Sequence, residues 1–579
     1  MNYISIFFIL YSSFVFCQQS LVIEEPLINS TTIKIYLSEN GSDNNLGDSL
    51  SPLKTFSEAL NKIENLTINH TGEIFSEVVL FPGTYREIFR QPINKFEVNS
   101  RRLNVSLRGI DAVTLDGNNL TVASGSGMIH LLGSNISIRN LSVKSSNENG
   151  IRFGYNFNGK IINTHDIFID NVEVSGTKGH GILLGIGALN ANGTNILIPK
   201  AKRFKVTNCQ IHDAVNYNTA QSQWGSALKF WNTSNSTASK NHIYDNSGEG
   251  IDFDFCDSAI VSENKLHDNY ANIYLDKMQV ALIEKNLIYN ETKKVSGILL
   301  GIEAFTLYVT NHYMKDIFIE NNIILNTTGI NIWQGIYSAI QNASFNNIQI
   351  RYNTLIGKQH ANGALISFSY ETILGNPVAN ISFGNLKIEK NILSANPDSL
   401  NNNLLMSAPL NPQPALTYES NLFNMNPGFG YNTQSDKINS LLPQYLFPNQ
   451  NLIFALTPDS LNNNPFFFRK VNNLNLSKDY MNFNRLTMTN VGALESVNST
   501  NINSMNLNKT IIFPNPSSKK IKISTQNSIL GQNYSIINVF GETCTEGNYQ
   551  NSIDIESLQP GIYFLRIDGI KELLRFQKK

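Results

Sequence analysis

The sequence predicts an all-β protein whose main part is a right-handed parallel β-helix, a solenoid of about ten or more coils. Three observations support this fold: the length of the chain, a short repeated phrase, and alternation of apolar and polar residues inside each repeat. The chain has 579 residues, whereas a single hydrophobic core stops growing near ~250–300 residues. It therefore needs several domains or a solenoid that grows by adding coils.

Composition narrows the class of protein. The net charge is −1, from 44 Lys+Arg and 45 Asp+Glu, which argues against a nucleic-acid-binding protein because such proteins carry a basic excess. Hydrophobic residues make up 41% and aromatic residues 10% of the chain, which argues against disorder.

The N-terminus predicts export. Ile4 to Phe16 is an apolar run of signal-peptide length and is too short to span a bilayer. We expect a signal peptide over 1–17, cleaved after Cys17, and a short lead over 18–30. Lipidation of Cys17 is an alternative, although bulky Phe16 stands where such sites carry a small residue. No later stretch could cross a membrane, so we expect a soluble exported protein. We also expect this protein to be a monomer.

Three cysteines then remain, Cys209, Cys256 and Cys544. Their odd number and wide spacing predict neither a disulfide framework nor a metal site. We expect all three to be small buried hydrophobes.

The segment before the repeats predicts a cap. Strand-like Ile33–Asp43 is followed by Ser51–Phe56, by a short helix ending at Ile63, and by Val78–Tyr85 with its Pro-Gly-Thr-Tyr ending. This order resembles the N-terminal cap of secreted β-helix carbohydrate-active proteins. A cap protects the open end of a solenoid from edge pairing. The loop from Asp43 to Asp48 fits a calcium site or a plain turn.

The repeated phrase is Asn, a variable residue, then Ile or Leu. From Asn241 to Asn264 is 23 residues and from Asn264 to Asn286 is 22. Further copies stand at Asn140, Asn171, Asn208, Asn322, Asn353 and Asn391. Three short strands and three turns fit one such period. We interpret the Asn residues as a structural ladder between coils. His212 and His267 share one turn position and are expected to be structural too.

After about Asn401–Asn403 the repeats fade, and Val491–Glu495 fits a closing strand, so the capped β-helix is predicted over 31–497. A Ser/Thr/Asn-rich linker follows over 498–510. Residues 511–579 contain Pro514-Asn515-Pro516 and Leu558-Gln-Pro-Gly-Ile-Tyr563 and strongly resemble the C-terminal sorting domain of type IX secretion in Bacteroidetes. The alternating strands themselves predict a small β-sandwich. The resemblance implies contact with the type IX machinery, passage through the periplasm and outer membrane, removal of this domain, and secretion or surface attachment.

Outward-facing residues of the coils are the candidates for function. Ten residues before Asn241, Asn264 and Asn286, and again twelve residues before them, the alternation predicts two outward columns of side chains. The first column reads Gly154, Gly185, Trp231, Asp254, Asp276, Gly301, Trp333. The second column reads Arg152, Leu183, Lys229, Asp252, Tyr274, Leu299, Asn331. Leu228, Phe230, Ile251, Phe253, Ile273 and Leu275 are predicted to face the core.

Asp254 and Asp276 indicate glycosidase chemistry. Adjacent coils lie ~4.8 Å apart, so the two carboxylates repel and the pKa of one rises. Glycosidases need one ionised and one protonated carboxyl, and retaining enzymes hold them ~5–5.5 Å apart. Two of the three tryptophans, Trp231 and Trp333, flank this pair, and aromatic faces suit sugar rings. We expect the glycines of the column to leave room for neighbouring sugar units.

Gly250-Ile-Asp-Phe-Asp254, followed 22 residues later by Asp276, resembles the paired motif of β-helix β-xylosidases and of the α-fucosidase/xylanase families. The resemblance implies Asp254 as nucleophile and position 276 as acid/base. Those families carry Glu at the second position and favour an aromatic residue where this chain has Asp252.

Two other functions stay open. Ala227-Leu-Lys229 resembles the strand that carries the lysine base of β-helix pectate lyases, which implies Lys229 as base and calcium held by Asp252 or Asp254. A non-catalytic surface adhesin or glycan-binding protein would need the tryptophans, of which the third is Trp224, but not the carboxylates. Further candidate substrate contacts are Asp252, Tyr274, Arg152 and His180, and Glu303 is an alternative acid. No bound cofactor is expected, apart from the possible calcium.

Overall fold

The computed structural model describes the β-helix almost continuously up to residue 395. The described residues are 24–29, 33–157, 160–162, 164–186, 199–215, 225–290, 296–304, 311–336, 342–357, 364–372, 381–395, 406–407, 416–419, 421–423, 437–438, 468–469, 489–490, 511–513, 519–524, 530–538, 543–568 and 574–578. The predicted signal peptide, the linker, the strand at Val491–Glu495, Pro514–Pro516 and Trp224 lie outside them.

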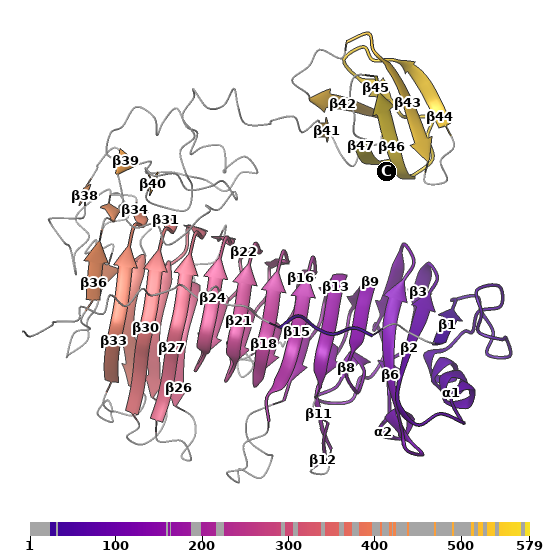
Figure 1. The fold of residues 1–579 in the computed structure, drawn as a ribbon, viewed down its shortest axis with the longest axis horizontal. Coiled ribbons are helices and arrows are strands. Elements are labelled where there is room, and N and C mark those ends of the chain that lie inside the picture. The colour runs from indigo at the N-terminus through magenta and orange to yellow at the C-terminus, as the bar shows by residue number, and fades with distance from the viewer. Residues whose placement is uncertain are drawn as a thin grey trace, which may run out of the picture. The chain divides into compact units, whose positions relative to one another are not determined.

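The chain divides into two compact units, 1–496 and 497–579. The first is a solenoid built from two long sheets whose strands are almost all parallel (Figure 1). The prediction of a parallel β-helix is confirmed.

The larger sheet has 25 strands and bends around the solenoid. Its strands are β1 (Ile33–Leu37), β2 (Gly72–Leu80), β3 (Gly83–Tyr85), β5 (Glu97–Val98), β6 (Arg101–Gly109), β7 (Val113–Asp116), β9 (Ile136–Lys144), β13 (His165–Ser175), β15 (Ala201–Thr207), β16 (Gln210–His212), β18 (Thr233–Ser239), β19 (His242–Tyr244), β21 (Asp257–Ser262), β22 (Lys265–His267), β24 (Gln279–Glu284), β25 (Leu287–Tyr289), β27 (Asn311–Glu320), β28 (Ile323–Leu325), β30 (Asn342–Arg351), β31 (Thr354–Gly357), β33 (Ile381–Glu389), β34 (Ile392–Ala395), β36 (Leu416–Glu419), β37 (Leu422–Phe423) and β38 (Lys437–Ile438).

The second sheet has 11 strands, one from each successive coil. They are β4 (Phe89–Arg90), β8 (Gly127–His130), β10 (Asn149–Phe153), β14 (Ile182–Gly185), β17 (Ser226–Trp231), β20 (Glu249–Asp254), β23 (Ala271–Asp276), β26 (Ser296–Ala304), β29 (Ile330–Ile336), β32 (Ile366–Thr372) and β35 (Met406–Ser407). Two antiparallel pairs add β11 (Tyr155–Phe157) with β12 (Lys160–Ile162), and β39 (Phe468–Arg469) with β40 (Thr489–Asn490).

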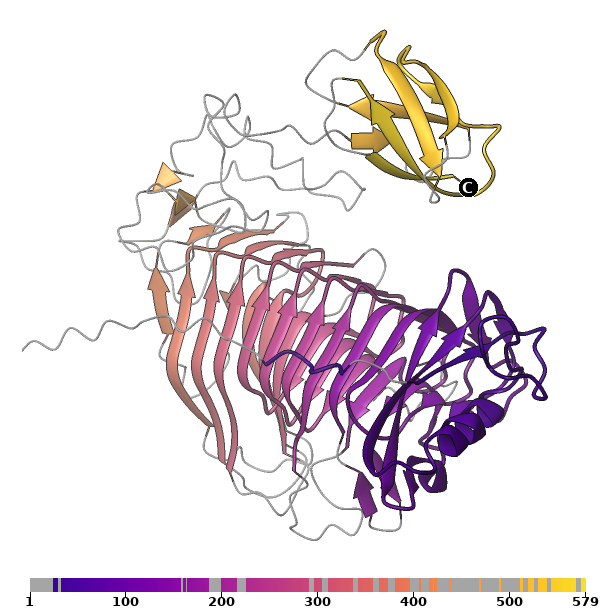
Figure 2. The same ribbon diagram turned by 45° about the vertical axis from the view of Figure 1, so that its right-hand side comes forward.

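The N-terminal cap contains helix α1 (Phe56–Leu66), the indigo helix of Figure 2, which lies beside β1, and the short helix α2 (Ile93–Phe96), which lies beside β5 and β6. Thr55 caps α1 because its side chain accepts a hydrogen bond from the Glu58 backbone N–H. In the preceding loop the carboxylates of Asp43 and Asp48 accept hydrogen bonds from Thr55 and Ser51. Such bonds form an ordered turn. No described helix is long and apolar enough to span a membrane.

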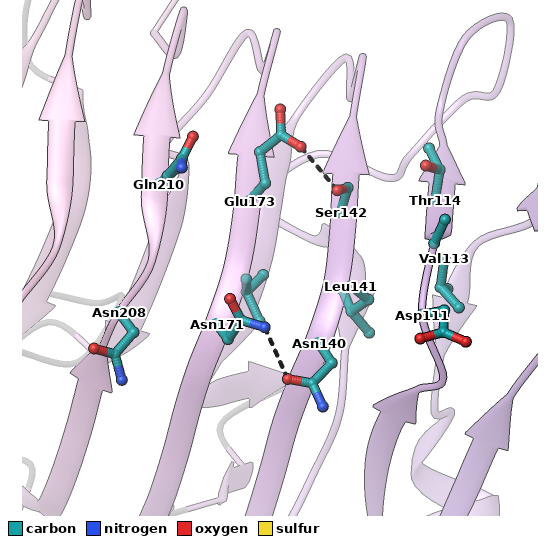
Figure 3. A pocket seen from close by; sticks show the side chains of 12 residues that line it. Asp111, Val113, Thr114, Asn140, Leu141, Ser142, Asn171, Glu173, Asn208 and Gln210 are labelled. Carbon is teal, nitrogen blue, oxygen red and sulfur yellow. Dashed lines mark hydrogen bonds between the residues drawn. The ribbon is translucent and has the colours of Figure 1, made fainter. Parts of the chain in front are cut away.

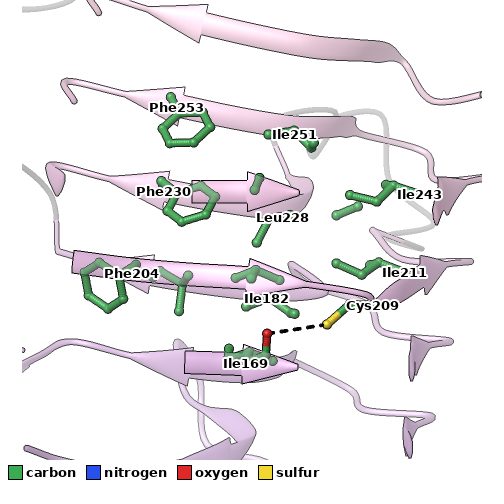
Figure 4. Close-up of a cluster of buried hydrophobic side chains, with 14 of the residues drawn as sticks. Ile169, Ile182, Phe204, Cys209, Ile211, Leu228, Phe230, Ile243, Ile251 and Phe253 are labelled. Atoms are coloured by element: carbon green, nitrogen blue, oxygen red, sulfur yellow. Dashed lines mark hydrogen bonds between the residues drawn. The ribbon is translucent and has the colours of Figure 1, made fainter. Parts of the chain in front are cut away.

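The core of the solenoid consists of like side chains stacked between coils (Figure 4). The rings of Phe230 and Phe253 stack with centroids 4.3 Å apart. All six residues predicted to face inward on β17, β20 and β23 are fully buried. The Phe230 ring thus packs against the ring of the next coil, which stabilises the coil spacing.

An asparagine ladder runs along the larger sheet, but its register differs from the prediction. Its members are buried, and each accepts hydrogen bonds from the preceding coil: Asn241, Asn264, Asn286, Asn322, Asn353, Asn391 and Asn421. Asn208 stands instead one residue before the ladder position of its coil, where φ is +53°. Asn140 and Asn171 share this left-handed position, and the ladder positions of the first coils hold Leu141, Val172 and Cys209. The predicted bonding between coils does hold at this position, since Asn171 donates to Asn140 at 2.9 Å and Asn208 donates to Asp170 of the preceding coil at 2.7 Å.

The second unit is a β-sandwich of antiparallel sheets, as predicted. Three strands, β41 (Ile511–Phe513), β42 (Lys520–Ser524) and β45 (Ile553–Asp554), face four, β43 (Asn533–Asn538), β44 (Thr543–Asn548), β46 (Gly561–Ile567) and β47 (Leu574–Lys578). Ile521, Ile536 and Leu565 share one core. Cys544 is exposed on β44, so the prediction that it is buried is wrong, whereas Cys209 and Cys256 are buried.

Candidate functional site

The strand pairing of the 11-stranded sheet aligns the two predicted columns. Trp231 pairs with Asp254, Asp254 with Asp276, Asp276 with Gly301, and Gly301 with Trp333. In the second column, Arg152, Leu183, Lys229, Asp252, Tyr274, Leu299 and Asn331 follow one another in the same way. The structure therefore brings the candidate catalytic residues together on β17, β20 and β23.

The glycines of the first column do not have the predicted purpose. A Cβ on Gly301 would lie 2.7 Å from the ring of Tyr274, so this glycine makes room for a protein side chain. Gly154 and Gly185 have φ of +93° and +94° and closely approach the backbone of the next coil. The expectation that these glycines leave room for sugar units is wrong.

Lys229 holds the first two carboxylates. Its Nζ lies 2.6 Å from Asp252 Oδ2 and 3.6 Å from Asp254 Oδ2. Its ammonium also lies 5.8 Å from the centre of the Trp231 ring, within cation–π range. Burial opposes the charge of Lys229, but Asp252 and Asp254 outweigh it and raise its pKa above the usual 10.5. Lys229 is therefore a fixed cation.

Two residues that the sequence analysis missed complete this side of the cluster. Ser226 Oγ donates its hydrogen to Asp252 Oδ2 at 2.8 Å and lies 3.2 Å from Glu249 Oε2, with which it shares a second hydrogen bond. Burial, and next the charge of Asp252, raise the pKa of Glu249 to about 8. Burial also raises the pKa of Asp252 against the effect of Lys229. The raised pKa favours the protonated form of Glu249 near the Lys229–Asp252 ion pair.

Asp276 lies in a second group of charges with Lys277, Glu303 and Tyr274. Its Oδ2 accepts a hydrogen bond from Lys277 Nζ, and its Oδ1 accepts one from the Glu303 backbone N–H at 3.0 Å. Tyr274 donates its hydroxyl to Glu303 Oε1 at 2.6 Å. Burial raises the pKa of Asp276 well above its usual range. Lys277 opposes this rise, whereas Asp254 and Glu303 add to it. Burial raises the pKa of Glu303 as well.

The cluster keeps three buried polar atoms without a hydrogen-bond partner among the described residues. They are Trp231 Nε1, Asp252 Oδ1 and Asp254 Oδ1. The Asp254 side chain is 18% exposed, whereas that of Asp252 is 3% exposed. Since buried polar atoms are normally paired, these three indicate positions for ligand groups. Asp254 is the carboxylate that both reaches solvent and retains a free oxygen.

The other predicted contacts surround the cluster at different distances along the solenoid. Arg152, two coils before Lys229, donates from Nη1 to the Gly185 carbonyl at 2.6 Å and is buried. His180 Nδ1 accepts the Ser226 N–H at 2.9 Å. Burial, then Lys229 and Arg152, lower the pKa of His180 to about 3, so the ring is neutral. Half-buried Trp333 lies two coils beyond Asp276.

A hollow of about 510 Å³ lies elsewhere, on the 25-stranded sheet (Figure 3). The left-handed asparagines Asn140, Asn171 and Asn208 form one side, and Asn171 donates to Asn140 at 2.9 Å. Ser142 donates to Glu173 at 2.8 Å. No predicted site residue lines this hollow.

Comparison with protein families matches two parts of the chain. Residues 161–311 match the right-handed beta helix region. Residues 511–578 match the secretion system C-terminal sorting domain. The chain is a right-handed β-helix followed by a type IX sorting domain. The sorting domain indicates export to the cell surface or secretion. No curated protein matches the sequence.

Several solved structures resemble the β-helix at low identity. XylC in complex with xylose is 10% identical, with 80% of this chain and 98% of that chain covered and a TM-score of 0.38. PfbA, a surface adhesin of Streptococcus pneumoniae, is 12% identical, with 67% and 90% covered and a TM-score of 0.41. The GH136 lacto-N-biosidase from Eubacterium ramulus is 12% identical, with 61% and 68% covered and a TM-score of 0.33.

Proposed function

We propose that the β-helix hydrolyses a glycosidic bond of an extracellular glycan, with Asp254 as nucleophile and Asp276 as general acid and base. The observation that carries the proposal is the pairing of two unlike carboxyl groups on adjacent coils. Asp254 keeps a free oxygen and some exposure to solvent, whereas Asp276 is 4% exposed with a raised pKa. Glycosidases require this division of roles.

In the proposed first step, Asp254 attacks the anomeric carbon while the glycosidic C–O bond breaks. The proton of Asp276 passes to the leaving oxygen. In the second step, water attacks the same carbon, Asp276 takes its proton, and Asp254 is released. Paired strands lie ~4.8 Å apart, near the ~5–5.5 Å separation of retaining enzymes. We therefore expect retention of configuration.

Glu303 is the second candidate for the acid. Its pKa is raised by burial, and it faces the charges of Asp254 and Asp252. Both oxygens of Asp276 already accept hydrogen bonds, whereas Glu303 receives one side-chain bond, from Tyr274. The proposal keeps Asp276 because it pairs directly with Asp254 across β20 and β23.

The state of Lys229 argues against β-elimination. A lysine base must be neutral to take a proton, yet Asp252 and Asp254 hold Lys229 as a cation. An adhesin is the remaining alternative, for which a buried pair of unlike carboxyls has no use.

The test is incubation of the full chain with plant and algal polysaccharides and aryl glycosides. New reducing ends without ultraviolet absorbance support hydrolysis, and NMR of the first product gives the anomer. Absorbance from unsaturated uronates would instead indicate elimination with Lys229 at its centre. Retention on a glycan column with neither signal would favour the adhesin.

A further inference from the structure

A second cluster of chemically active side chains lies on the three-residue strands β16, β19, β22 and β25 of the larger sheet, outside the proposed active site. Four aromatic rings stack there in consecutive coils, His212, Tyr244, His267 and Tyr289. Their centroids are 4.8, 5.1 and 4.6 Å apart, with interplanar angles between 9° and 16°. The stack fixes the plane of each imidazole, as the predicted structural role requires.

One further ring joins this stack from the side. His242, two residues before Tyr244 on β19, forms a hydrogen bond between its Nε2 and Nε2 of His267 on the next coil, at 3.1 Å, and a bound metal ion would replace the shared proton. Two nitrogens bound to one tetrahedral Zn²⁺ with bonds of ~2.0–2.1 Å are roughly 3.3 Å apart. The observed distance between the two Nε2 atoms is therefore within a few tenths of an ångström of the distance between two nitrogens bound to one metal ion.

The surroundings of His267 favour the ligand form of its Nε2. Its other nitrogen, Nδ1, lies 3.1 Å from Oδ2 of the buried Asp268. A carboxylate accepts the Nδ1 proton and leaves the Nε2 lone pair for a metal, which is the usual second shell of a metal-binding histidine. Asp245, on the preceding coil, brings a second carboxylate within 4.8 Å of His267 and Asp268.

We propose that His242 and His267 bind a divalent transition-metal ion that ties adjacent coils together. Imidazole pairs suit Cu²⁺, Ni²⁺ and Zn²⁺, and water completes the coordination. Asp268 orients His267, and Asp245 adds negative charge. Lys265, paired with His242 in the sheet, opposes a cation, but its ammonium is drawn to the Tyr289 ring at 5.7 Å.

His212, in the same stack, has other partners. Its Nδ1 lies 2.7 Å from Asp213 Oδ2, and its Nε2 lies 3.4 Å from Glu173 Oε1. His212 therefore offers a matched control in the same stack.

The test is calorimetric titration of the full chain, purified without a polyhistidine tag, with Zn²⁺, Cu²⁺ and Ni²⁺ at neutral pH. We expect one site, with Cu²⁺ the tightest. His242→Gln and His267→Gln should each weaken binding at least ~10-fold, and Asp268→Asn ~10–100-fold. His212→Gln should bind as the parent does. Circular dichroism checks that each variant is folded.

Electron paramagnetic resonance of the Cu²⁺ form should show coupling to two imidazole nitrogens, and to one in His242→Gln. The proposal is overturned if the parent binds none of the three ions. It is also overturned if binding survives both His242→Gln and His267→Gln, or if His212→Gln weakens it as much as they do.

Discussion

Two stacks of polar side chains run along this solenoid, and they differ in how their hydrogen bonds are satisfied. In the asparagine ladder each amide both donates and accepts, so Asn264 donates to Asn286 and Asn286 donates to Asn322. In the carboxylate columns, Asp252, Asp254 and Asp276 can only accept when ionised. They depend on Lys229, Lys277 and Ser226 for donors.

The difference separates stability from reactivity. A self-complementary amide column buries its polar groups at little cost, because each coil presents what the next requires. A carboxylate column leaves charges and unpaired oxygens, which costs stability but holds groups ready for a substrate. The predictions below test this contrast.

The largest effect is expected from Asp254→Asn. The change preserves shape but removes the nucleophile, so kcat should fall on the order of 10³-fold or more. The melting temperature should not fall, because one charge of a crowded cluster is removed. Initial rates on the glycan identified in the screen measure the effect. The exposed Asp213→Asn is the control, and turnover retained in Asp254→Asn refutes the assignment.

The acid is identified by comparing Asp276→Asn with Glu303→Gln. Loss of the acid should cost ~10²–10⁴-fold in kcat on a natural glycan. The loss should be much smaller on an aryl glycoside whose leaving group needs no proton. We expect this pattern for Asp276→Asn. The same pattern in Glu303→Gln alone would transfer the acid role to Glu303.

The ladder should be sensitive to Asn286→Ala. Asn286 Oδ1 accepts both the backbone N–H and the side-chain amide of Asn264, and its own amide donates to Asn322 and to the Val261 carbonyl. Removing it leaves buried groups unpaired, at about 2–4 kcal/mol. Thermal unfolding followed by circular dichroism measures the loss, with exposed Asn44→Ala as control. An equal effect of both changes would contradict the ladder's role.

The smallest effect concerns Glu249 and depends on pH. Folded Glu249 keeps its proton up to about pH 8, whereas the unfolded chain releases it near 4.5. Between these values the folded chain binds more protons, so this residue makes stability fall as pH rises. Glu249→Gln should therefore raise the melting temperature more at pH 8 than at pH 5. A uniform shift across this window would refute the raised pKa.

The sequence predicts the outward columns well because inward residues fix the register. Phe230 and Phe253 both face the core and pair with each other across adjacent strands. The residues that follow them, Trp231 and Asp254, must therefore pair as well and face outward. Glu249 and Lys277 escaped prediction because they lie at strand ends. Lys277 follows β23 with φ of +50°, where alternation no longer gives the direction of a side chain.

The ladder shows the same limit. Asn208 and Asn241 look equivalent in the repeated phrase, yet they differ by one position, and that position separates an exposed turn from a buried ladder. Asparagine is favoured at both, because it tolerates left-handed backbone and also pairs amides. The sequence pattern alone therefore does not distinguish them, whereas the bond from the Cys209 backbone to Asn241 does.

The spacing of Asp254 and Asp276 is fixed by the backbone pairing of β20 and β23. Neither strand can shift along the other without breaking the hydrogen bonds between them. The strand pairing therefore sets the separation of the two residues that carry the carboxyl groups, with or without a bound ligand. The proposed hydrolysis therefore requires a sugar that fits this spacing.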